Sequence, residues 1–247
     1  MPDLVVGNAV IPYTLRRSPT ARKARITVTP DQVEVVVPAA ANDDQIARIL
    51  AKKRAWIFEH HQRMAERLAG MHTIRRFTTG AKIPYRGRLA RLTVGTTAER
   101  LVSISYRSGF TIDCPHQIPE EGRDAVIESE LRLWMKTRLR HDVQALARPL
   151  AARLGTKPRD IRVKDQRTMW GSCGQDRVVN LNWRLVFAPR QVLEYALAHE
   201  MAHLRERHHG AAFWSVVRSL MPDYEPHKAW LEANEHLLGY RVIPVEI

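Results

Sequence analysis

The sequence predicts an α+β protein with a β-rich N-terminal half that contains one helix, and a more helical C-terminal half. Three observations support this fold class. Short runs rich in Val, Ile and Thr dominate residues 1–110, as is typical of strands. A long helical pattern begins near residue 121, and a histidine-rich helix follows near residue 190. We therefore expect two domains, one over residues 1–110 and one over residues 111–247.

The N-terminal half is expected to begin with strands and continue into its one helix. The runs RITVTP and VEVVVP are short and β-branched, and they end at Pro30 and Pro38. A helix is predicted over residues 43–68, with Asn42 or Asp43 as its N-terminal cap and Gly70 after its end. Its apolar period predicts a core face made of Ile46, Ile49, Leu50, Lys53 and Trp56.

Two hairpins and a long helix are expected next. IPYRGRLARLTV turns at Arg86-Gly87, and LVSISYRSGFTI turns at Ser108-Gly109. The stretch from GRDAVIESEL to AARLG predicts a long helix, bent at Pro149 and ended by Gly155.

The segment after this helix is predicted to be a hairpin that leads into a second helix. IRVKDQ forms one strand, MWGSCGQD the loop and RVVNLNWRLVFA the other strand. In that last run five apolar residues alternate with Asn180, Asn182 and Arg184, which indicates a half-buried strand. Its polar side is either a candidate surface for pairing with a substrate peptide or a solvated face. Pro189 then opens a helix that is expected to reach about Arg207.

Composition excludes several classes of protein. Hydrophobic residues make up 45% of the chain, enough for a core, so a disordered chain is excluded. No apolar run is long enough to span a bilayer, and the N-terminus lacks the features of a secretion signal. Two cysteines, Cys114 and Cys173, cannot form a disulfide framework. We expect a cytoplasmic protein without a membrane partner.

Positive charge is unevenly distributed. The formal net charge is +13, and residues 1–110 contain 19 Lys and Arg against 8 Asp and Glu, whereas residues 111–247 contain 20 against 18. Two explanations remain open: a surface in the N-terminal half that binds nucleic acid or another polyanion, or general solubility. The basic clusters are Arg16-Arg17, Arg22-Lys23-Arg25, Lys52-Lys53-Arg54 and Arg75-Arg76.

The stretch AHEMAHLRERHHGAAFW contains the pattern HExxH. His199 and His203 are four residues apart, so on a helix both imidazoles lie on one face and can bind one metal ion. Zinc is the metal typical of this spacing, with the intervening Glu200 as general base. Glu200 stands in an aliphatic stripe with Leu193, Leu197 and Leu204. A carboxylate there is costly unless it has a partner, and burial raises its proton affinity as a general base requires.

The third ligand is less clear from spacing alone. A catalytic zinc takes three protein ligands and leaves one position open, whereas a structural zinc takes four. His208 and His209 are both candidates, and the helix must stop before either can turn toward the metal. Gly210 would permit a sharp turn there. Both histidines are alternatively surface cations that suit the end of a helix.

The region RTMWGSCGQDRVVNLNWRLVFAPRQVLEYALAHEMAHLRERHHGAAFWSVVRSLMPDY resembles the core of the YgjP-like metal-dependent hydrolases, which are related to the SprT-like and Wss-like zinc metallopeptidases. The similarity extends more loosely over the N-terminal half. It implies a zincin-like (minigluzincin) unit in which Zn²⁺ is held by His199, His203 and His209, with Glu200 catalytic. The family often has Asn before and Ser after the third ligand, where this chain has His208 and Gly210.

The resemblance favours a zinc metallopeptidase that acts on a protein or peptide substrate. Two alternatives remain: a metal-dependent nucleotide phosphohydrolase, and a nucleic-acid-binding module with a structural zinc. Cys173 is either a small buried residue, a nucleophile or a fourth ligand. Trp170, Phe213 and Trp214 are interpreted as core residues, and Asp223 and Glu225 are unassigned. The sequence specifies neither the substrate nor the oligomeric state.

Overall fold

The chain forms two compact units, the first from residues 1–71 with 235–240 and the second from residues 72–234. Helices and sheets are both present, which confirms the α+β class. The units divide near residue 71, not near residue 110 as expected, because the strands between these positions pack on the long helix of the second unit. The computed structural model describes residues 2–7, 9–28, 33–69, 74, 76–166 and 168–239.

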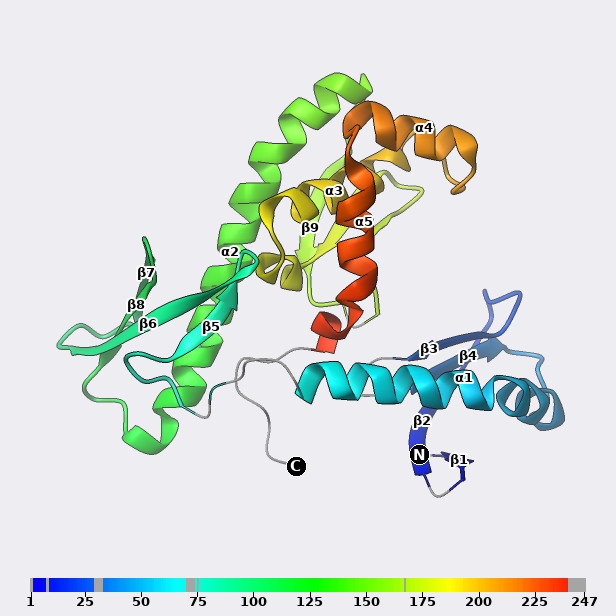
Figure 1. The fold of residues 1–247 in the computed structure, drawn as a ribbon, viewed down its shortest axis with the longest axis horizontal. Coiled ribbons are helices and arrows are strands. Elements are labelled where there is room, and N and C mark those ends of the chain that lie inside the picture. Colours follow the sequence, from blue (N-terminus) through cyan, green and yellow to red (C-terminus); the bar gives the residue numbers. More distant parts are fainter. Residues whose placement is uncertain are drawn as a thin grey trace. The chain divides into compact units, whose positions relative to one another are not determined.

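The N-terminal unit consists of a four-stranded sheet packed against one helix (Figure 1). Its strand order is β1-β2-β4-β3, with β1 (Asp3–Val6), β2 (Ala9–Ser18), β3 (Arg25–Val28) and β4 (Val33–Pro38). In helix α1 (Asp43–Ala69) the backbone N–H of Gln45 donates to Asn42 Oδ1 at 2.9 Å, and Asn42 N–H donates to Gln45 Oε1 at 3.1 Å. Asn42 is therefore the cap, in a reciprocal capping arrangement. The proposed end signals Pro30 and Gly70 lie outside the described residues.

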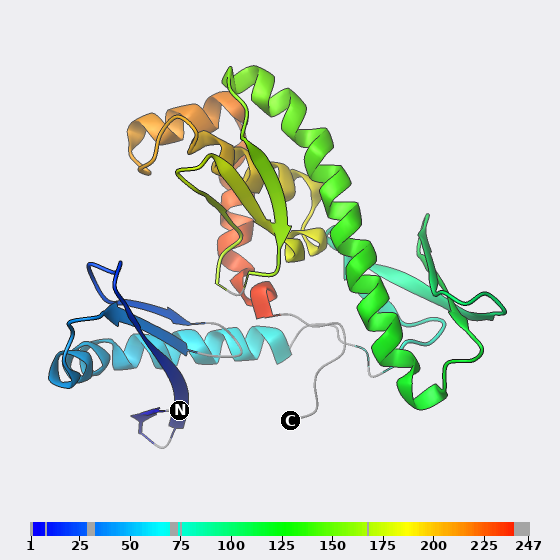
Figure 2. The same ribbon diagram turned by 180° about the vertical axis from the view of Figure 1, so that it is seen from behind.

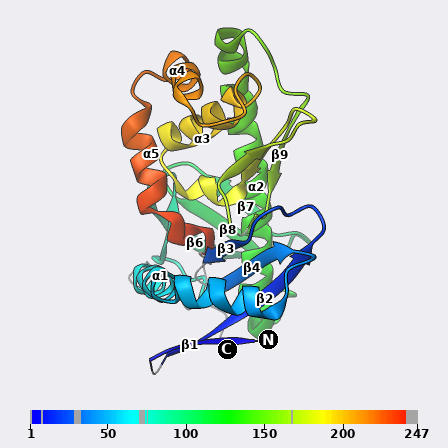
Figure 3. The same ribbon diagram turned by 90° about the vertical axis from the view of Figure 1, so that its right-hand side faces the viewer.

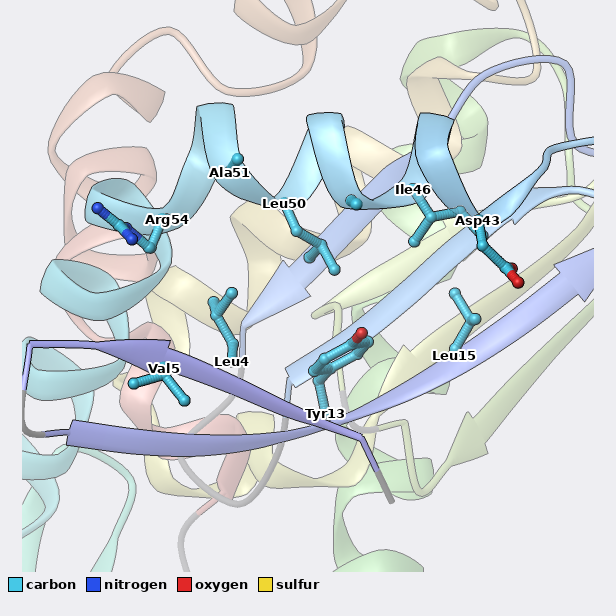
Figure 4. Close-up of a pocket in the computed structure, with 10 residues that line it drawn as sticks. Leu4, Val5, Tyr13, Leu15, Asp43, Ile46, Leu50, Ala51 and Arg54 are labelled. Carbon is cyan, nitrogen blue, oxygen red and sulfur yellow. The ribbon is translucent and has the colours of Figure 1, made fainter.

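The core face of α1 differs in part from the expected one. Ile46, Leu50 and Ile57 are buried against the valines of β4. Lys53 is exposed, because burying an unpaired ammonium group is costly, and Trp56 is 39% exposed and stacks on His60. A cavity of about 390 Å³ opens between the β1–β2 hairpin and α1, lined mostly by apolar side chains (Figure 4). None of the predicted site residues lines it.

Helix α2 (Glu120–Leu154) is the central element of the second unit and contacts both its β-sheet region and its C-terminal helices (Figure 1). It continues through Pro149 and ends at Gly155, whose φ of 68° is the left-handed conformation that favours glycine. The predicted end of this helix is thus confirmed.

A four-stranded sheet with order β5-β6-β8-β7 packs on α2. The strands are β5 (Lys82–Tyr85), β6 (Arg88–Thr97), β7 (Ser103–Tyr106) and β8 (Phe110–Pro115), and both predicted hairpins are present. Phe110 lies between Tyr85 and Trp134 of α2, with ring centroids 5.1 and 5.3 Å away. Arg86 also forms an ion pair with Asp142 of α2. These contacts explain why the sheet belongs to the second unit.

The third sheet corrects the hairpin predicted after α2. Strand β11 (Val178–Asn182) pairs in parallel with β9 (Asp160–Lys164) and antiparallel with β10 (Gly171–Cys173). The predicted long strand also ends early, because residues Trp183–Phe187 form a 3-10 helix, η1. Asn182 stops the strand: its side chain accepts a hydrogen bond from Arg184 N–H, which caps η1.

The C-terminal part of this unit contains three helices: α3 (Arg190–Ala202), α4 (Ala211–Leu220) and α5 (Tyr224–Ala233). Helix α3 contacts the third sheet on one side and α4 and α5 on the other (Figures 2 and 3). The short 3-10 helix η2 (Glu235–Gly239) packs on α1 in the N-terminal unit. No helix of the described residues has the length and apolar character needed to cross a membrane.

Candidate metal centre

Helix α3 carries the first half of the candidate site. It begins after Pro189, as predicted, but ends at Ala202 and not near Arg207. His199 and Glu200 therefore lie in its last turn, and His203 is the residue that caps its C-terminus. His209 lies in the loop that leads to α4, so the helix does stop before it. The adjacent Gly210 has φ of −80°, which any residue can adopt, so this break does not depend on glycine.

Three imidazoles meet at the end of α3. One ligand atom from each of His199, His203 and His209 lies within 4.8 Å of the others. Nε2 of His199 is 3.1 Å from Nε2 of His209. Such close approach of two ring nitrogens suits a shared cation that both would bind. His208, the rival third ligand, is exposed and is not in the cluster.

The other ring nitrogens of two histidines face away from the cluster. Nδ1 of His203 lies 3.0 Å from the carbonyl oxygen of Glu206, and Nδ1 of His199 lies 3.5 Å from the hydroxyl of Tyr195. A proton on each Nδ1 would leave Nε2 with a free lone pair. Burial, followed by the charges of His203 and His209, lowers the pKa of His199 to about 3. Burial also lowers the pKa of His203, so both rings are held in the neutral form that metals bind.

Glu200 is a buried carboxyl group beside the cluster. It is 8% exposed, and this burial raises its pKa to about 8. Of the predicted aliphatic stripe, Leu193 and Leu197 are buried, whereas Leu204 is half-buried and lies beyond the end of α3. Strand β10 passes directly against it: a Cβ added to Gly171 would lie 2.7 Å from Glu200 Oε1. Glycine is therefore needed at position 171, which sequence reasoning did not identify.

Aromatic side chains form one wall of the site. The ring of Phe213 lies 4.6 Å from those of His203 and His209, and the ring of Trp214 lies 6.0 Å from that of His199. Phe213 is fully buried, as predicted for a core residue, yet it also packs on all three histidines, with the ring of His199 at 4.9 Å. Tyr195 was missed, although its position one helical turn before His199 is a signal that could have found it.

The remaining candidates lie outside the cluster. The Cys173 thiol is not part of it, and burial raises the thiol pKa, which disfavours both a nucleophile and a ligand thiolate. Glu225 lies 3.4 Å from the guanidinium of Arg218, and Asp223 lies 4.0 Å from His227. Within the described residues, three histidines alone offer a metal site.

Comparisons with known proteins give one family and one similar solved structure. Residues 22–234 match the model of a family described as YgjP-like, metallopeptidase domain. The chain is similar to a crystal structure of the metallopeptidase zymogen abylysin from Pyrococcus abyssi, with 18% identity and a TM-score of 0.35. The matched region covers 37% of this chain and 93% of the abylysin chain. No curated protein matches the chain.

Proposed function

This chain belongs to the YgjP-like metallopeptidase family, and from that membership we propose that it is a zinc-dependent peptidase with Glu200 as general base. Membership implies a metal ion and a protein or peptide substrate. The proposed ligands are His199, His203 and His209. The observation that carries the proposal is their convergence beside a buried carboxyl group. The two free cysteines support the cytoplasm as the proposed location.

The choice of metal follows from the donor set. Three imidazole ligands suit zinc, whereas the hard cations of phosphoryl transfer prefer oxygen ligands. This favours a peptidase over the nucleotide phosphohydrolase. The cluster holds three donors and not the four of a structural zinc, and His209 is exposed at its open side. This favours a catalytic site over a structural zinc in a nucleic-acid-binding module.

The metal site, Glu200 and strand β10 would each have a separate role in hydrolysis. Bound zinc would lower the pKa of a water molecule and polarise the scissile carbonyl group. Glu200 accepts a proton from the attacking water and donates it to the leaving amine. Burial raises the pKa of the carboxyl group to about 8 and makes it a stronger base, and the positive charge of a bound cation would favour the ionised form that accepts the proton. Strand β11, whose polar side was the predicted surface for a peptide, is the central strand of its sheet and is already paired on both sides. Strand β10 lies at the edge of this sheet against Glu200 and offers a backbone with which an extended peptide can pair.

The substitution Glu200→Gln tests the general base. Gln keeps the shape of Glu but cannot accept a proton, so zinc content should stay at one ion per chain. Peptide hydrolysis should fall by about 10²- to 10⁴-fold. Metal analysis and peptide turnover measure the two quantities. Unchanged turnover would reject Glu200 as the base.

The substitution His203→Ala tests the ligand set. It should abolish stoichiometric zinc binding at micromolar metal, and His208→Ala is the matched control. Full zinc content in His203→Ala, with loss in His208→Ala, would show that the ligands are wrongly assigned. Release of phosphate from nucleotides with Mg²⁺ or Mn²⁺, and no cleavage of peptides, would favour the phosphohydrolase instead.

A further inference from the structure

The backbone of β10 has one side that faces away from its sheet. Asn182 N–H donates to Trp170 O at 2.8 Å, and Gly174 N–H donates to Val178 O at 3.0 Å. The backbone carbonyl group of residue 170 and the backbone N–H of residue 174 therefore point toward β11. The direction of the backbone N–H and C=O groups alternates along a strand, and therefore those of Gly171 and Cys173 point away from β11. Strand β10 is an edge strand, so these outward groups are where a peptide would pair.

Arg207 occupies one end of this outward edge. Its Nη1 donates to the carbonyl oxygens of Cys173 at 3.3 Å and of Gly174 at 3.0 Å. The residue comes from the loop between His203 and His209, so the same loop supplies two histidines and contacts the edge at the Cys173 carbonyl group, while the N–H of Cys173 is not bound by Arg207. The part of the edge beside Gly171 remains next to Glu200.

Arg207 also brings a positive charge to the path of the peptide. Its side chain is exposed, and among the described residues no carboxylate is seen in an ion pair with it. Its Nη1 donates to the two carbonyl oxygens and its side chain also hydrogen-bonds the Cys173 thiol, so the remaining N–H groups of the guanidinium can meet a further acceptor. Cys173 is two residues, about 7 Å, along the strand from Gly171. A peptide residue opposite Cys173 would therefore lie beside the guanidinium group.

We infer that Arg207 is a specificity-determining residue that selects peptides with an acidic side chain, Asp or Glu, on the N-terminal side of the cleaved bond. The inference rests on the proposed peptidase function. Antiparallel pairing, the more stable arrangement per residue, places the peptide residue opposite Cys173 upstream of the one opposite Gly171. A carboxylate there would accept a charge-assisted hydrogen bond from Arg207.

A cleavage profile on a library of random peptides tests this inference. The zinc-loaded full chain should cleave peptides with Asp or Glu on the N-terminal side about 3- to 10-fold faster than those with Lys at the same position. Arg207→Gln should remove this preference without loss of zinc. Arg205→Gln is the matched control, because Arg205 lies in the same loop but its guanidinium lies beside Gly155. That variant should keep the preference.

A second measurement needs no variant. Because the preference arises from an exposed charge, it should weaken in the wild-type protein when NaCl is raised from about 50 to about 500 mM. A wild-type chain that cleaves no peptide overturns the proposed function itself. A wild-type chain that cleaves peptides but shows no acidic preference, or shows one that is unchanged in Arg207→Gln or by salt, overturns the assignment of Arg207 alone.

Discussion

Individual hydrogen-bonding groups orient the histidines of the candidate site. Tyr195 and the Glu206 carbonyl each lie at the Nδ1 atom that points away from the cluster. Groups in this position fix the ring and the tautomer of a metal ligand. Burial raises the pKa of Tyr195, so its hydroxyl remains protonated over the working pH range. The ring of Tyr195 is held in turn by Tyr224, on which it stacks at 6.1 Å.

The substitution Tyr195→Phe should lower zinc affinity by about 10-fold, because the ring stays in place while the oxygen that accepts from His199 is removed. Competition with a fluorescent chelator measures this affinity. Tyr224→Phe is the control, since it removes a hydroxyl from the same stack without touching His199. Equal affinity in the two variants and the wild-type protein would mean that the hydroxyl of Tyr195 does not orient the ligand.

The reactivity of Cys173 should depend on pH in the direction set by its burial. Burial raises its pKa above the ordinary value of 9.0, so less thiolate is present at any pH below that value than in an unfolded chain. Alkylation by iodoacetamide should therefore be slow at pH 7 and should rise only above about pH 9. Mass spectrometry of native and denatured protein gives the two rates, with the fully buried Cys114 as an internal control. Rapid native alkylation at pH 7 would restore Cys173 as a candidate nucleophile.

At the scale of elements, side chains decide where strands and helices end. The apolar alternation over residues 178–187 predicts one strand, but the chain turns into η1 after Asn182. Asn182 is fully buried, and its Nδ2 donates to the carbonyl oxygens of Gln166 at 2.7 Å and Met169 at 3.0 Å. These bonds tie β11 to the segment that leads into β10.

The substitution Asn182→Ala should reduce the free energy of unfolding by about 2–4 kcal/mol, because it removes a fully buried side chain and leaves two carbonyl groups and one backbone N–H without their partner. Denaturant unfolding measures the change. Asn180→Ala, which removes a side chain that is only half-buried, should cost less than about 1 kcal/mol. A similar cost at both positions would contradict the special role of Asn182.

At the scale of the whole molecule, the division near residue 71 changes which unit contains most of the excess positive charge. Residues 1–71 contain 11 Lys and Arg against 7 Asp and Glu, whereas residues 72–110 contain 8 against 1. The densest basic segment thus belongs to the unit that carries the candidate site. On its sheet Lys82 and Arg91 lie directly opposite each other, and both are exposed. Like charges in that arrangement repel, which an anion would relieve.

We therefore retain polyanion binding as a proposal, now on the β5–β6 surface. The full chain should bind a fluorescent DNA with affinity that falls steeply with salt. The double variant Lys82→Gln/Arg91→Gln should lower the salt slope of log K by about 0.9 for each phosphate that it no longer neutralises. Lys52→Gln/Lys53→Gln on α1 is the control. Binding that ignores salt, or equal effects of both pairs, would reduce the basic segment to a solubility feature. The cluster Arg75-Arg76 offers no test, because Arg75 lies outside the described residues.

Local patterns in the sequence were sufficient for the α+β class, for both hairpins before α2, for the ends of α2 and for the placement of His199, Glu200 and His203 on one helix. Each of these depends on residues within one or two turns of each other, where period and spacing act directly. Spacing left His208 and His209 open, and resemblance to a family favoured His209. The tertiary structure brings His209 into the cluster, sets Gly171 against Glu200, places Arg207 at one end of the β10 edge and pairs β9 with β11 in parallel. These contacts join segments that are 10 to 34 residues apart in the sequence. The packing of the whole unit determines them, because the local periodicity of apolar residues does not specify which distant segments come into contact.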